Sequence, residues 1–523
     1  MNKKTLNRKI CILITLLLIA AIAVAGCVNK NQNGTTDNGK DDQKYIPDYG
    51  GTVNIACNTP NSLNPLKTAY NNVADMLFFV YEGLFTANED LTVNPVLAQK
   101  YTVSTSNKMY AITLKQGVKF HDGRDFTSAD VIATMDYLKN YETNYSQCVA
   151  DILSYTAVDD YTVNIELINP QPDFMAVMDF PILPRGLTKE AFEAQNQAFI
   201  PNGTGRYKFA SSNQLRGITL TKNSEWHGKD ATYIQDINVE YLDDEDAIFK
   251  SFNSGELDMI TTSDLKWGEF SFSADIKGYE CGTGSYTYIG VNADIDFLSD
   301  KENRKAIASQ IDKKDLCEAV VFKHGYPAYT PVISTSQYSK NIQKGTKVKD
   351  GNSKKVQNYN VSVYLLYNSE SEEKARAADF IKKSLESSGI KIIPIVVDFN
   401  TYCEKIKNND YQLYLGEVKM ANNMNMDFMF NGVLKTDQNL CNFASDEFYS
   451  LINNYDLLTT EGEQTSIVYT NLLNFFNENV PQIPLYHKTK ALYVNPRIKG
   501  KIKPNMSTFY GDAGGMYINT KEK

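Results

Sequence analysis

Residues 361–397 carry a strand–helix–strand pattern that constrains the fold more than any other part of the chain. The stretches VSVYLLYN at 361–368 and IKIIPIVV at 390–397 are short apolar runs rich in β-branched residues, which are typical of buried strands. Between them, residues 372–389 place apolar side chains at helical spacing and end on Gly389, a residue favoured just after a helix. This order predicts two parallel strands joined by a helix, and hence a mixed α/β fold with a partly parallel sheet.

The chain is too long for one compact domain. It has 523 residues, and domains usually hold about 100 to 200 residues, so about two to four domains are expected. Hydrophobic residues make up 42% and charged residues 22%, ordinary globular values that exclude wholesale disorder and a polytopic membrane protein. The formal charge of -9 disfavours a nucleic-acid partner, because binding phosphates requires a basic surface.

The first 26 residues have the pattern of an export signal. Residues 1–10 contain Lys3, Lys4, Arg8 and Lys9 and no acidic residue, and an apolar run follows as far as Ala25. A helix needs about 20 residues to cross a bilayer comfortably, and this run is shorter. Residues 1–26 are therefore predicted to be a signal peptide that is removed from the mature protein.

The signal ends in Val24-Ala25-Gly26-Cys27, which resembles the lipobox of bacterial lipoproteins. This resemblance implies cleavage before Cys27 and attachment of lipid to its thiol. Residues 28–44 are dense in Asn, Gly, Asp and Lys and bury too little apolar surface to fold, so residues 27–44 are predicted to be the lipidated cysteine and a disordered tether. The protein is thus expected outside the bacterial cytoplasmic membrane, held at its outer face by the lipid, because two or three acyl chains anchor durably.

Six further cysteines are spread through the body of the chain: Cys57, Cys148, Cys281, Cys317, Cys403 and Cys441. They form neither a CxxC pair nor a zinc-like quartet. Export permits disulfides, although a body of this size does not need them for stability. Mostly buried free thiols are expected, and the sequence leaves a disulfide pairing open.

One ordered set of motifs extends over most of the chain. Residues 95–135 open with PVLA, pass through an expected hairpin and continue with KFHDG and TSADV. Five further matches follow in order: NGTGRY at 202–207, NSEW at 223–226, NSGELD at 253–258, residues 304–312, and IPLY at 483–486. Together they resemble the family 5 solute-binding proteins of bacterial ABC importers, a family of oligopeptide-, dipeptide- and nickel-binding lipoproteins. The resemblance spans roughly residues 50–490.

The resemblance implies an α/β fold with two lobes, the type II periplasmic-binding-protein-like fold of the large peptide-binding class, with an extra subdomain in the first lobe. The implied parts are lobe 1 from residues 45–85, 201–288 and 486–523, the extra subdomain from 86–200, and lobe 2 from 289–485. Two segments, near Tyr286–Asn292 and Gln482–Tyr486, would connect the lobes. Such proteins close around their ligand by a hinge motion.

His121, in the KFHDG motif, has two interpretations. A histidine between a strand and a helix can be catalytic or bind a metal. We expect instead that Asp122 and Gly123 form a turn and that His121 hydrogen-bonds to nearby backbone groups, which makes the motif a marker of the fold.

The ligand site is implied by the resemblance to peptide-binding relatives, in which an extended peptide adds to a strand through backbone hydrogen bonds. The matching segment is 416–430. Aligning it on Asp427 places Asn422 where relatives carry an Asp that pairs with the peptide's ammonium, and Lys419 where an aromatic residue often lies. Both departures argue against a free amino terminus, because an Asn carbonyl accepts without charge assistance. In another register, Glu417 or Asp427 would supply the charge.

The remaining expected ligand contacts are the backbone groups of Val418 and Met420 and, on the first lobe, Ala69, Tyr70 and Asn71. The alternative is that these residues belong to a core strand and a turn. The four methionines of the segment, Met420, Met424, Met426 and Met429, also resemble the ligands of a soft-metal site for Cu(I). We expect them to be flexible filler of an irregular pocket instead.

No metal or cofactor is expected. The four histidines, His121, His227, His324 and His487, are too scattered for a nickel-type cluster, although a chelated metal is compatible with binding through its organic ligand. The chain lacks GxSxG and HExxH, which argues against a serine hydrolase and a metalloprotease, whereas its many carboxylates do not exclude a glycosidase.

The predicted function is therefore that of a monomeric, lipid-anchored binding protein, not an enzyme. It would capture a small solute, for which a short peptide is the expected class, and deliver it to an ABC permease and its ATPase. A sensor lipoprotein, such as a pheromone receptor, and an exported hydrolase are the alternatives. The sequence does not separate transport from sensing.

Overall fold

The computed structural model describes residues 45–195, 198–213, 215–263, 272–273, 275–340, 359–426, 429, 443, 445–457, 465–500, 502–511 and 513–522. The predicted signal peptide 1–26, Cys27, the rest of the tether to residue 44, Asp427 and Cys441 lie outside these residues. The chain divides into two units, residues 1–46 with 520–523 and residues 47–519. In the first unit β1 (Tyr45–Pro47) pairs with β19 (Thr520–Glu522).

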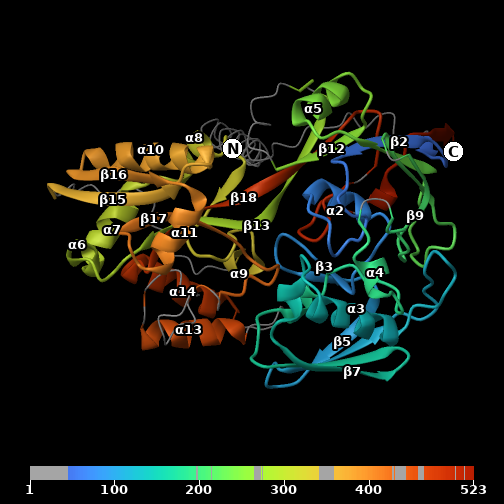
Figure 1. Cartoon of the computed structure of the whole chain (residues 1–523), viewed down its shortest axis with the longest axis horizontal. Coiled ribbons are helices and arrows are strands. Elements are labelled where there is room, and N and C mark those ends of the chain that lie inside the picture. The colour runs from blue at the N-terminus through green and yellow to red at the C-terminus, as the bar shows by residue number, and fades with distance from the viewer. Residues whose placement is uncertain are drawn as a thin grey trace, which may run out of the picture. The chain divides into compact units, whose positions relative to one another are not determined.

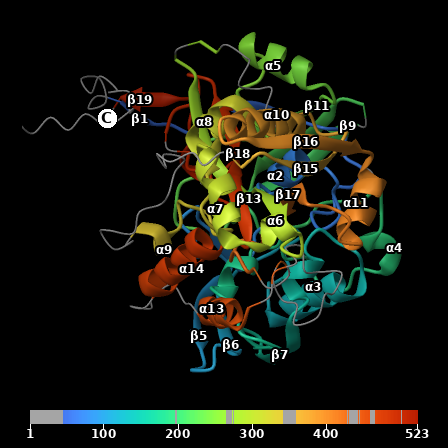
Figure 2. The ribbon, with the colours of Figure 1, turned by 90° about the vertical axis from the view of Figure 1, so that its left-hand side faces the viewer.

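An eleven-stranded sheet runs through the second unit (Figures 1 and 2). Ten strands lie in the order β16 (Ile390–Val397), β15 (Val361–Asn368), β17 (Leu413–Lys419), β13 (Lys277–Val291), β18 (Gln482–Val494), β12 (Met259–Thr262), β2 (Thr52–Cys57), β11 (Asp236–Tyr241), β10 (Gly217–Lys222) and β9 (Tyr207–Asn213), and β14 (Gly325–Pro327) pairs with β18. The predicted strand–helix–strand unit is confirmed. β15 and β16 pair in parallel, and α10 (Glu372–Glu386) joins them.

Two long neighbouring strands, β13 and β18, belong to both halves of this sheet. β13 pairs with β17 over Ser285–Val291, whereas β18 pairs with β12 over Ala491–Val494. Their own antiparallel register shifts between Gly282 and Tyr286 and again between Thr287 and Tyr288. Register shifts of this kind bend a strand locally and increase its twist, so the shared strand pair changes direction between the two halves.

Helices cover both faces of the β15–β17 half. The helices here are α6 (Asp296–Ser299), α7 (Lys301–Gln310), α8 (Lys313–Val320), α9 (Gln337–Lys340), α10, α11 (Phe399–Lys407), α13 (Asp446–Asp456) and α14 (Thr465–Asn479). Ala377 and Ile381 of α10 pack with Leu365 of β15 in one core, and Tyr402 of α11 packs with the next residue, Leu366, in another. Because successive strand residues face opposite sides, this half is sandwiched between helices, which explains its continuous apolar strands.

A separate four-stranded sheet has the order β5 (Ala98–Val103), β6 (Met109–Leu114), β8 (Thr162–Leu167) and β7 (Ile152–Asp159). Tyr110, Ile112 and Leu114 alternate with less buried residues along β6, the pattern of a sheet with one face in the core. The helix α3 (Ser128–Asn140) contributes its apolar residues to the same core. Short elements complete this region: β3 (Phe85–Ala87), β4 (Val93–Pro95), η1 (Ser146–Val149), η2 (Phe174–Val177) and α4 (Lys189–Phe192).

The helix after β2 is shorter than its apolar spacing indicates. The spacing predicts a helix over residues 72–85 that ends near Gly83, but α2 ends at Leu77. The backbone beyond it is held by another segment, because Gly205 and Tyr207 donate their amide hydrogens to the carbonyls of Val80 and Phe79. A helix would need those carbonyls for its own hydrogen bonds. On the same half, α5 (Glu245–Asn253) follows β11.

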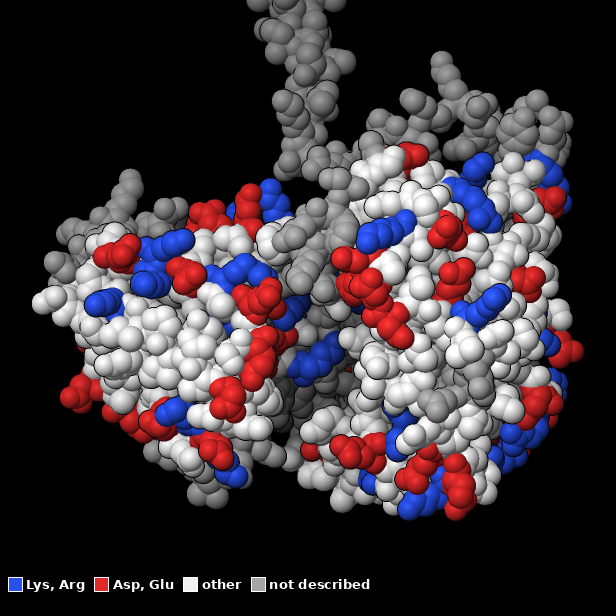
Figure 3. Space-filling view, turned by 45° about the horizontal axis from the view of Figure 1, so that its top comes forward, with Lys and Arg blue, Asp and Glu red and all other residues white. Residues whose placement is uncertain are grey.

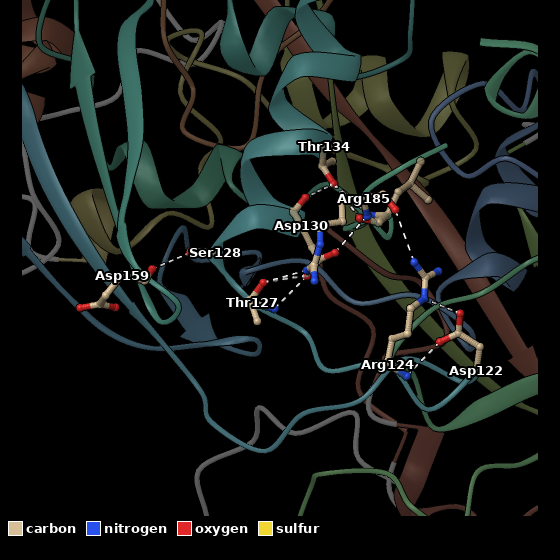
Figure 4. Close-up of polar contacts among 9 residues, drawn as sticks. Asp122, Arg124, Thr127, Ser128, Asp130, Thr134, Asp159 and Arg185 are labelled. Carbon is tan, nitrogen blue, oxygen red and sulfur yellow. Dashed lines mark hydrogen bonds and ion pairs between the residues drawn. The ribbon is translucent and has the colours of Figure 1, made fainter. Parts of the chain in front are cut away.

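The TSADV motif starts α3, and the spacing of Thr127 and Asp130, three residues apart, is the one that predicts a capping box at a helix start (Figure 4). The backbone amide of Thr127 donates to the carboxylate of Asp130 at 2.9 Å, which is the predicted capping box. Arg185 also pairs with Asp130 at 3.0 Å, and the Ser128 hydroxyl donates to the carbonyl of Asp159. The motif therefore ties the start of the helix to two other segments of the chain.

The turn predicted at Asp122 and Gly123 is confirmed, whereas the backbone groups that the His121 ring contacts belong to Gly203 and Gly205, more than 80 positions away, and not to the local chain. The Nε2 of His121 lies 3.0 Å from the carbonyl of Gly205, and its Nδ1 accepts from the amide of Gly203. Gly123 donates to the carbonyl of Phe120 and has a φ of 86°, which closes the expected turn. Burial lowers the pKa of His121, consistent with a neutral ring that donates from one nitrogen and accepts at the other.

The cysteines also follow the sequence prediction. Five of them, Cys57, Cys148, Cys281, Cys317 and Cys403, are free thiols, and three of these, Cys57, Cys281 and Cys317, are buried. Burial raises the pKa of Cys281 and Cys317 to about 12, so both remain protonated at neutral pH. They act as small apolar residues of the core.

We predict that His487 makes the fold sensitive to mild acid. It is fully buried in β18, stacked on the ring of Tyr286, and burial lowers its pKa from 6.5 to about 4. Below pH 6.5 the unfolded chain binds a proton that the folded chain does not, so this stability is present above pH 6.5 and is lost as the pH falls toward 4. The expected loss between pH 7 and pH 5 is about 2 kcal/mol.

Urea denaturation at both pH values measures this loss. A His487→Gln variant should lose less stability over the same interval, whatever its stability at pH 7. An unchanged loss in the variant would assign the acid sensitivity to other groups.

Candidate functional site

The parallel strands of the β15–β17 half all end on the same side of the sheet. β15 ends at Asn368 and β16 at Val397, and β17 runs parallel to β15. Directly after the first two strands, Ser371 caps the start of α10 and Asp398 caps the start of α11. Ligands of α/β proteins usually bind outside such carboxyl ends, where helix amino termini offer free N–H groups.

The other half has a corresponding edge. β2 and β11 are parallel to each other and end at Cys57 and Tyr241. Just beyond them, Asp243 accepts hydrogen bonds from the backbone amide of Thr59 at 2.7 Å and from its hydroxyl at 2.9 Å. The Thr59 amide is the main cause that lowers the pKa of Asp243, so this carboxylate is held ionised at the strand ends.

The strand β18 carries charged residues between the two edges. Tyr486 and Lys488 are two positions apart and therefore lie on the same face of the strand. The Tyr486 hydroxyl donates to Glu373 at 2.6 Å, and the Lys488 ammonium pairs with Glu373 at 2.6 Å and with Glu417 at 2.8 Å. Burial acts to lower the pKa of Lys488, but the two carboxylates overcome this effect and raise it. This charged cluster fixes α10 and β17 to β18.

Two residues further along the same face, Lys490 pairs with Asp75 of α2. The Thr261 hydroxyl of β12 donates to the same carboxylate at 3.2 Å. Burial lowers the pKa of Lys490 from 10.5 to about 7. One face of β18 thus binds acidic side chains from both halves of the sheet.

The surface is hollowed between two parts of the second unit, as Figure 3 shows. Basic side chains lie within the hollow, and acidic side chains border it on both sides. This arrangement suits a ligand that carries both donors and acceptors more than one with a large charge of a single sign.

The first-lobe residues named from the sequence lie at the start of α2. Ala69, Tyr70 and Asn71 are all exposed, and Tyr70 is the residue that precedes the helix. Tyr70 is 42% exposed. These three residues are therefore accessible to a ligand.

The amide of Met420, a residue predicted for the second lobe, is hydrogen-bonded within the protein. It donates to the carbonyl of Gly284 at 2.9 Å, and Val418 lies opposite Tyr286 in the ladder with β13. The side chain of Met420 is buried in the core. The backbone groups of these two residues therefore face β13, which corrects the expectation that they face a ligand.

The backbone N–H and C=O groups of the alternate residues of β17 point to its other edge, away from β13. The Tyr402 hydroxyl donates to the carbonyl of Leu415 at 2.7 Å from that side. Because N–H and C=O groups alternate along a strand, those of Glu417 and Lys419 share the edge with Leu415. On this edge β15 pairs only with Leu413 and Tyr414 of β17. The backbone groups on this edge are thus those of Glu417 and Lys419, each one residue before the expected Val418 and Met420.

Asn422 contacts Asp179, a residue that no pattern of the sequence marks. Its side-chain amide donates to the carboxylate of Asp179 at 2.6 Å, across 243 positions of the chain. The neighbouring Asn423 donates to Gln171 at 3.2 Å. No local motif marks Asp179, because its role depends on a contact that only the folded chain makes.

The other methionines of the segment are core residues. Met424, Met426 and Met429 are buried and belong to the same hydrophobic cluster as Phe448 and Tyr455. This supports the prediction that they fill an irregular interior. Within the described ranges, no group of three His, Cys, Asp or Glu side chains is arranged to hold a metal ion.

A second hollow, of about 310 Å³, lies between α7, α14 and the start of β18. Its charged residues have partners within the fold. The Lys313 ammonium donates to the carbonyl of Ala328, and Lys305 pairs with Glu302 and Glu478. We therefore place the candidate ligand site at the strand ends and not in this hollow.

The helices of the described part of the chain include none with the length and apolar character needed to cross a bilayer. Residues 92–439 match the family described as bacterial extracellular solute-binding proteins, family 5 Middle. The chain is 23% identical to the oligopeptide-binding protein OppA of Bacillus subtilis, over 95% of this chain and 98% of that protein. It is also 23% identical to the dipeptide-binding protein DppE of the same organism, over 93% and 95%.

Solved structures show the same fold. The murein tripeptide-binding protein MppA, in its unliganded open form, matches with a TM-score of 0.75 and 17% identity, over 91% of this chain and 99% of that one. The oligopeptide-binding protein AppA of Bacillus subtilis, in complex with a nonapeptide, matches with a TM-score of 0.62 and 20% identity, over 91% and 100%. The fold class predicted from the sequence, an α/β two-lobed type II periplasmic binding fold, is confirmed.

We predict that Lys488 is important for stability. Replacing it in a Lys488→Met variant leaves the carboxylates of Glu373 and Glu417 close together and partly buried without their cation. Loss of one partner from a buried ion pair usually costs about 3 to 5 kcal/mol. Urea denaturation measures the change in the free energy of unfolding.

The control is Lys323→Met, because Lys323 pairs with Glu318 where both side chains are more than 60% exposed. An exposed pair contributes about 0 to 1 kcal/mol. Equal losses in the two variants would show that the cluster on β18 contributes no more than a surface ion pair.

Proposed function

The chain belongs to family 5 of the bacterial extracellular solute-binding proteins, and on this premise we propose that it is the substrate-binding protein of an ABC importer for short peptides. It would capture the peptide between its two lobes and deliver it to the permease. The observation that carries this proposal is the backbone edge of β17 at Glu417 and Lys419, which lies beside the carboxyl ends of the parallel strands.

An edge of this kind suits peptide binding by strand addition. A peptide in extended conformation offers N–H and C=O groups at the same spacing as a strand, so main-chain hydrogen bonds give affinity for many sequences. The exposed residues Ala69, Tyr70 and Asn71 would border the peptide on the opposite lobe. The names of the relatives OppA, DppE and AppA, which bind oligopeptides or dipeptides, support the same ligand class.

The proposed layout of the chain follows the sequence analysis. Lobe 1 would comprise residues 45–85, 201–288 and 486–523, with the extra subdomain at 86–200, and lobe 2 would comprise 289–485. The continuous strands β13 and β18 would act as the hinge between the lobes, because they pair with neighbours in both halves of the sheet. Hinge closure around a ligand is typical of such binding proteins.

The proposed location is the outer face of the bacterial cytoplasmic membrane. Residues 1–26 would be the signal peptide, and Cys27 would carry the lipid. The segment up to residue 44 would tether the folded monomer near the permease and ATPase that it serves. A flexible tether of this length has a mean reach on the order of 20 to 25 Å, enough to hold a folded body clear of the bilayer.

The peptide proposal predicts that some peptides of about two to ten residues raise the melting temperature of the purified protein. A ligand present at about one hundred times its Kd stabilises the native state by about 2.7 kcal/mol. Differential scanning fluorimetry with a peptide library measures the shift. If no peptide shifts the transition while another class of solute does, the proposed ligand class is wrong.

The anchor proposal predicts that a Cys27→Ala variant accumulates as an uncleaved precursor without lipid, since the lipid attaches to that thiol. Labelling with a radioactive or alkynyl fatty acid, together with the mobility of the protein on a gel, distinguishes precursor from mature lipoprotein. Replacing Cys57, which is buried in the body, is the control and should leave lipidation intact. Efficient lipidation of the Cys27 variant would rule out the anchor.

A further inference from the structure

The turn between β3 and β4, residues 88–92, reaches from one half of the sheet into the core of the other. Its base is fixed, because the backbone amide of Ala87 donates to the hydroxyl of Ser507 at 2.7 Å. Phe85, the first residue of β3, is buried in the same hydrophobic cluster as the apolar residues of β2. The base of the turn therefore belongs to the half of the sheet that contains β2.

Leu91, at the tip of the turn, is buried in a different cluster. It is fully buried and belongs to the same cluster as Ile333 and as Leu366 of β15. Its φ is 65°, a left-handed conformation that a large side chain rarely adopts. Hydrogen bonds within the turn hold this conformation, since the Leu91 amide donates to the carbonyl of Asn88 and the Asn88 amide to that of Thr92. The turn thus presents Leu91 to the β15–β17 half despite local backbone strain.

Glu89 and Asp90 add polar contacts around Leu91. The carboxylate of Glu89 accepts from the backbone amide of Gly282 in β13 at 2.8 Å, and its carbonyl accepts from the Thr335 hydroxyl at 3.1 Å. The carbonyl of Asp90 accepts from the amide of Gln337, the first residue of α9, at 2.8 Å. The amides at the start of a helix have no partner within the helix, so the turn supplies one.

These contacts lie where the strand pair β13 and β18 bends. Gly282 is the last residue before the first register shift of this ladder. A Cβ atom at Gly282 would lie 2.4 Å from the Cδ1 of Ile333 and 3.7 Å from the carboxylate of Glu89. Both side chains therefore pack directly against the backbone at the bend. The turn connects the two halves of the sheet at the point where a hinge would move.

Residues 86–200 also contact the β15–β17 half at a second place. The side-chain amide of Asn423 donates to Gln171 at 3.2 Å, and both residues are buried. The side chain of Asn107 donates to the carbonyl of Leu457, just after α13, at 2.7 Å. All of these contacts join residues of the chain itself, so they hold the two halves together whether or not a ligand is bound.

We propose that the turn 88–92 is a hinge lock, and that the two halves separate only when Leu91 leaves the core of the β15–β17 half and Glu89 releases the amide of Gly282. The lock keeps the protein closed before a ligand arrives. Because a ligand enters and leaves through the open form, the lock lowers both rates. The inference rests on the proposed hinge at β13 and β18 and is independent of which solute binds.

Single-molecule fluorescence energy transfer on the purified protein tests the lock. The dyes are attached to an unnatural amino acid that replaces Lys250 of α5 and Lys382 of α10, two exposed residues in different halves of the sheet (Figure 1). Without ligand, the wild type should show mainly the short distance. Leu91→Ala should raise the ratio of open to closed molecules by about tenfold or more, because the closed form loses the packing of a buried side chain. Glu89→Ala removes one acceptor and should give a smaller shift in the same direction.

Leu472→Ala is the matched control. Leu472 is fully buried in the same cluster as Leu91, but it lies on α14, within the β15–β17 half. Its truncation should lower the stability and leave the distance distribution unchanged. The lock is overturned if Leu91→Ala has the open fraction of the wild type, or if Leu472→Ala raises that fraction as much.

A peptide library added to the wild type separates the lock from the proposed function. If peptides change the distance but Leu91→Ala does not, the hinge motion stands and the lock is wrong. If Leu91→Ala opens the protein although no peptide binds, the lock stands without the peptide function. If neither a variant nor a peptide changes the distance, the hinge motion itself fails and the lock with it.

Discussion

The antiparallel pairing of β13 and β18 is the interaction on which the rest of the structure depends. These strands are hydrogen-bonded to each other over most of their length and to different neighbours at their two ends. Because the strands are continuous, the position of each half is set by the same backbone ladder. The period of two along β18 then decides that Tyr486, Lys488 and Lys490 share one face, where they meet acidic residues of both halves.

The charged residues on this face also illustrate a general cost. Removing an ammonium and two carboxylates from water is unfavourable, and a buried ion pair seldom adds much net stability. Its effect is mainly to penalise arrangements that leave one partner alone. Lys488 between Glu373 and Glu417 therefore specifies how α10 and β17 fit against β18 more than it strengthens the fold.

The segment after β17 contains Asn422, which the sequence predicts as a ligand contact. The resemblance alone places Asn422 as a weaker substitute for a charged residue. The hydrogen bond to Asp179 gives its side chain a defined orientation instead. The orientation of the Asn422 side chain thus depends on a residue 243 positions away in the sequence.

The sequence by itself determined what depends on neighbours along the chain. The unit of β15, α10 and β16, the capping box at Thr127 and the turn at Gly123 follow from periodicity and local hydrogen bonding, and each is present. Only the tertiary structure decided the short α2, whose expected continuation is held by the amides of Gly205 and Tyr207, and the residues of β17 with which β15 pairs, Leu413 and Tyr414. Register and packing decide which backbone groups face a neighbouring strand and which distant carboxylate meets Asn422. A local sequence pattern carries no information about either.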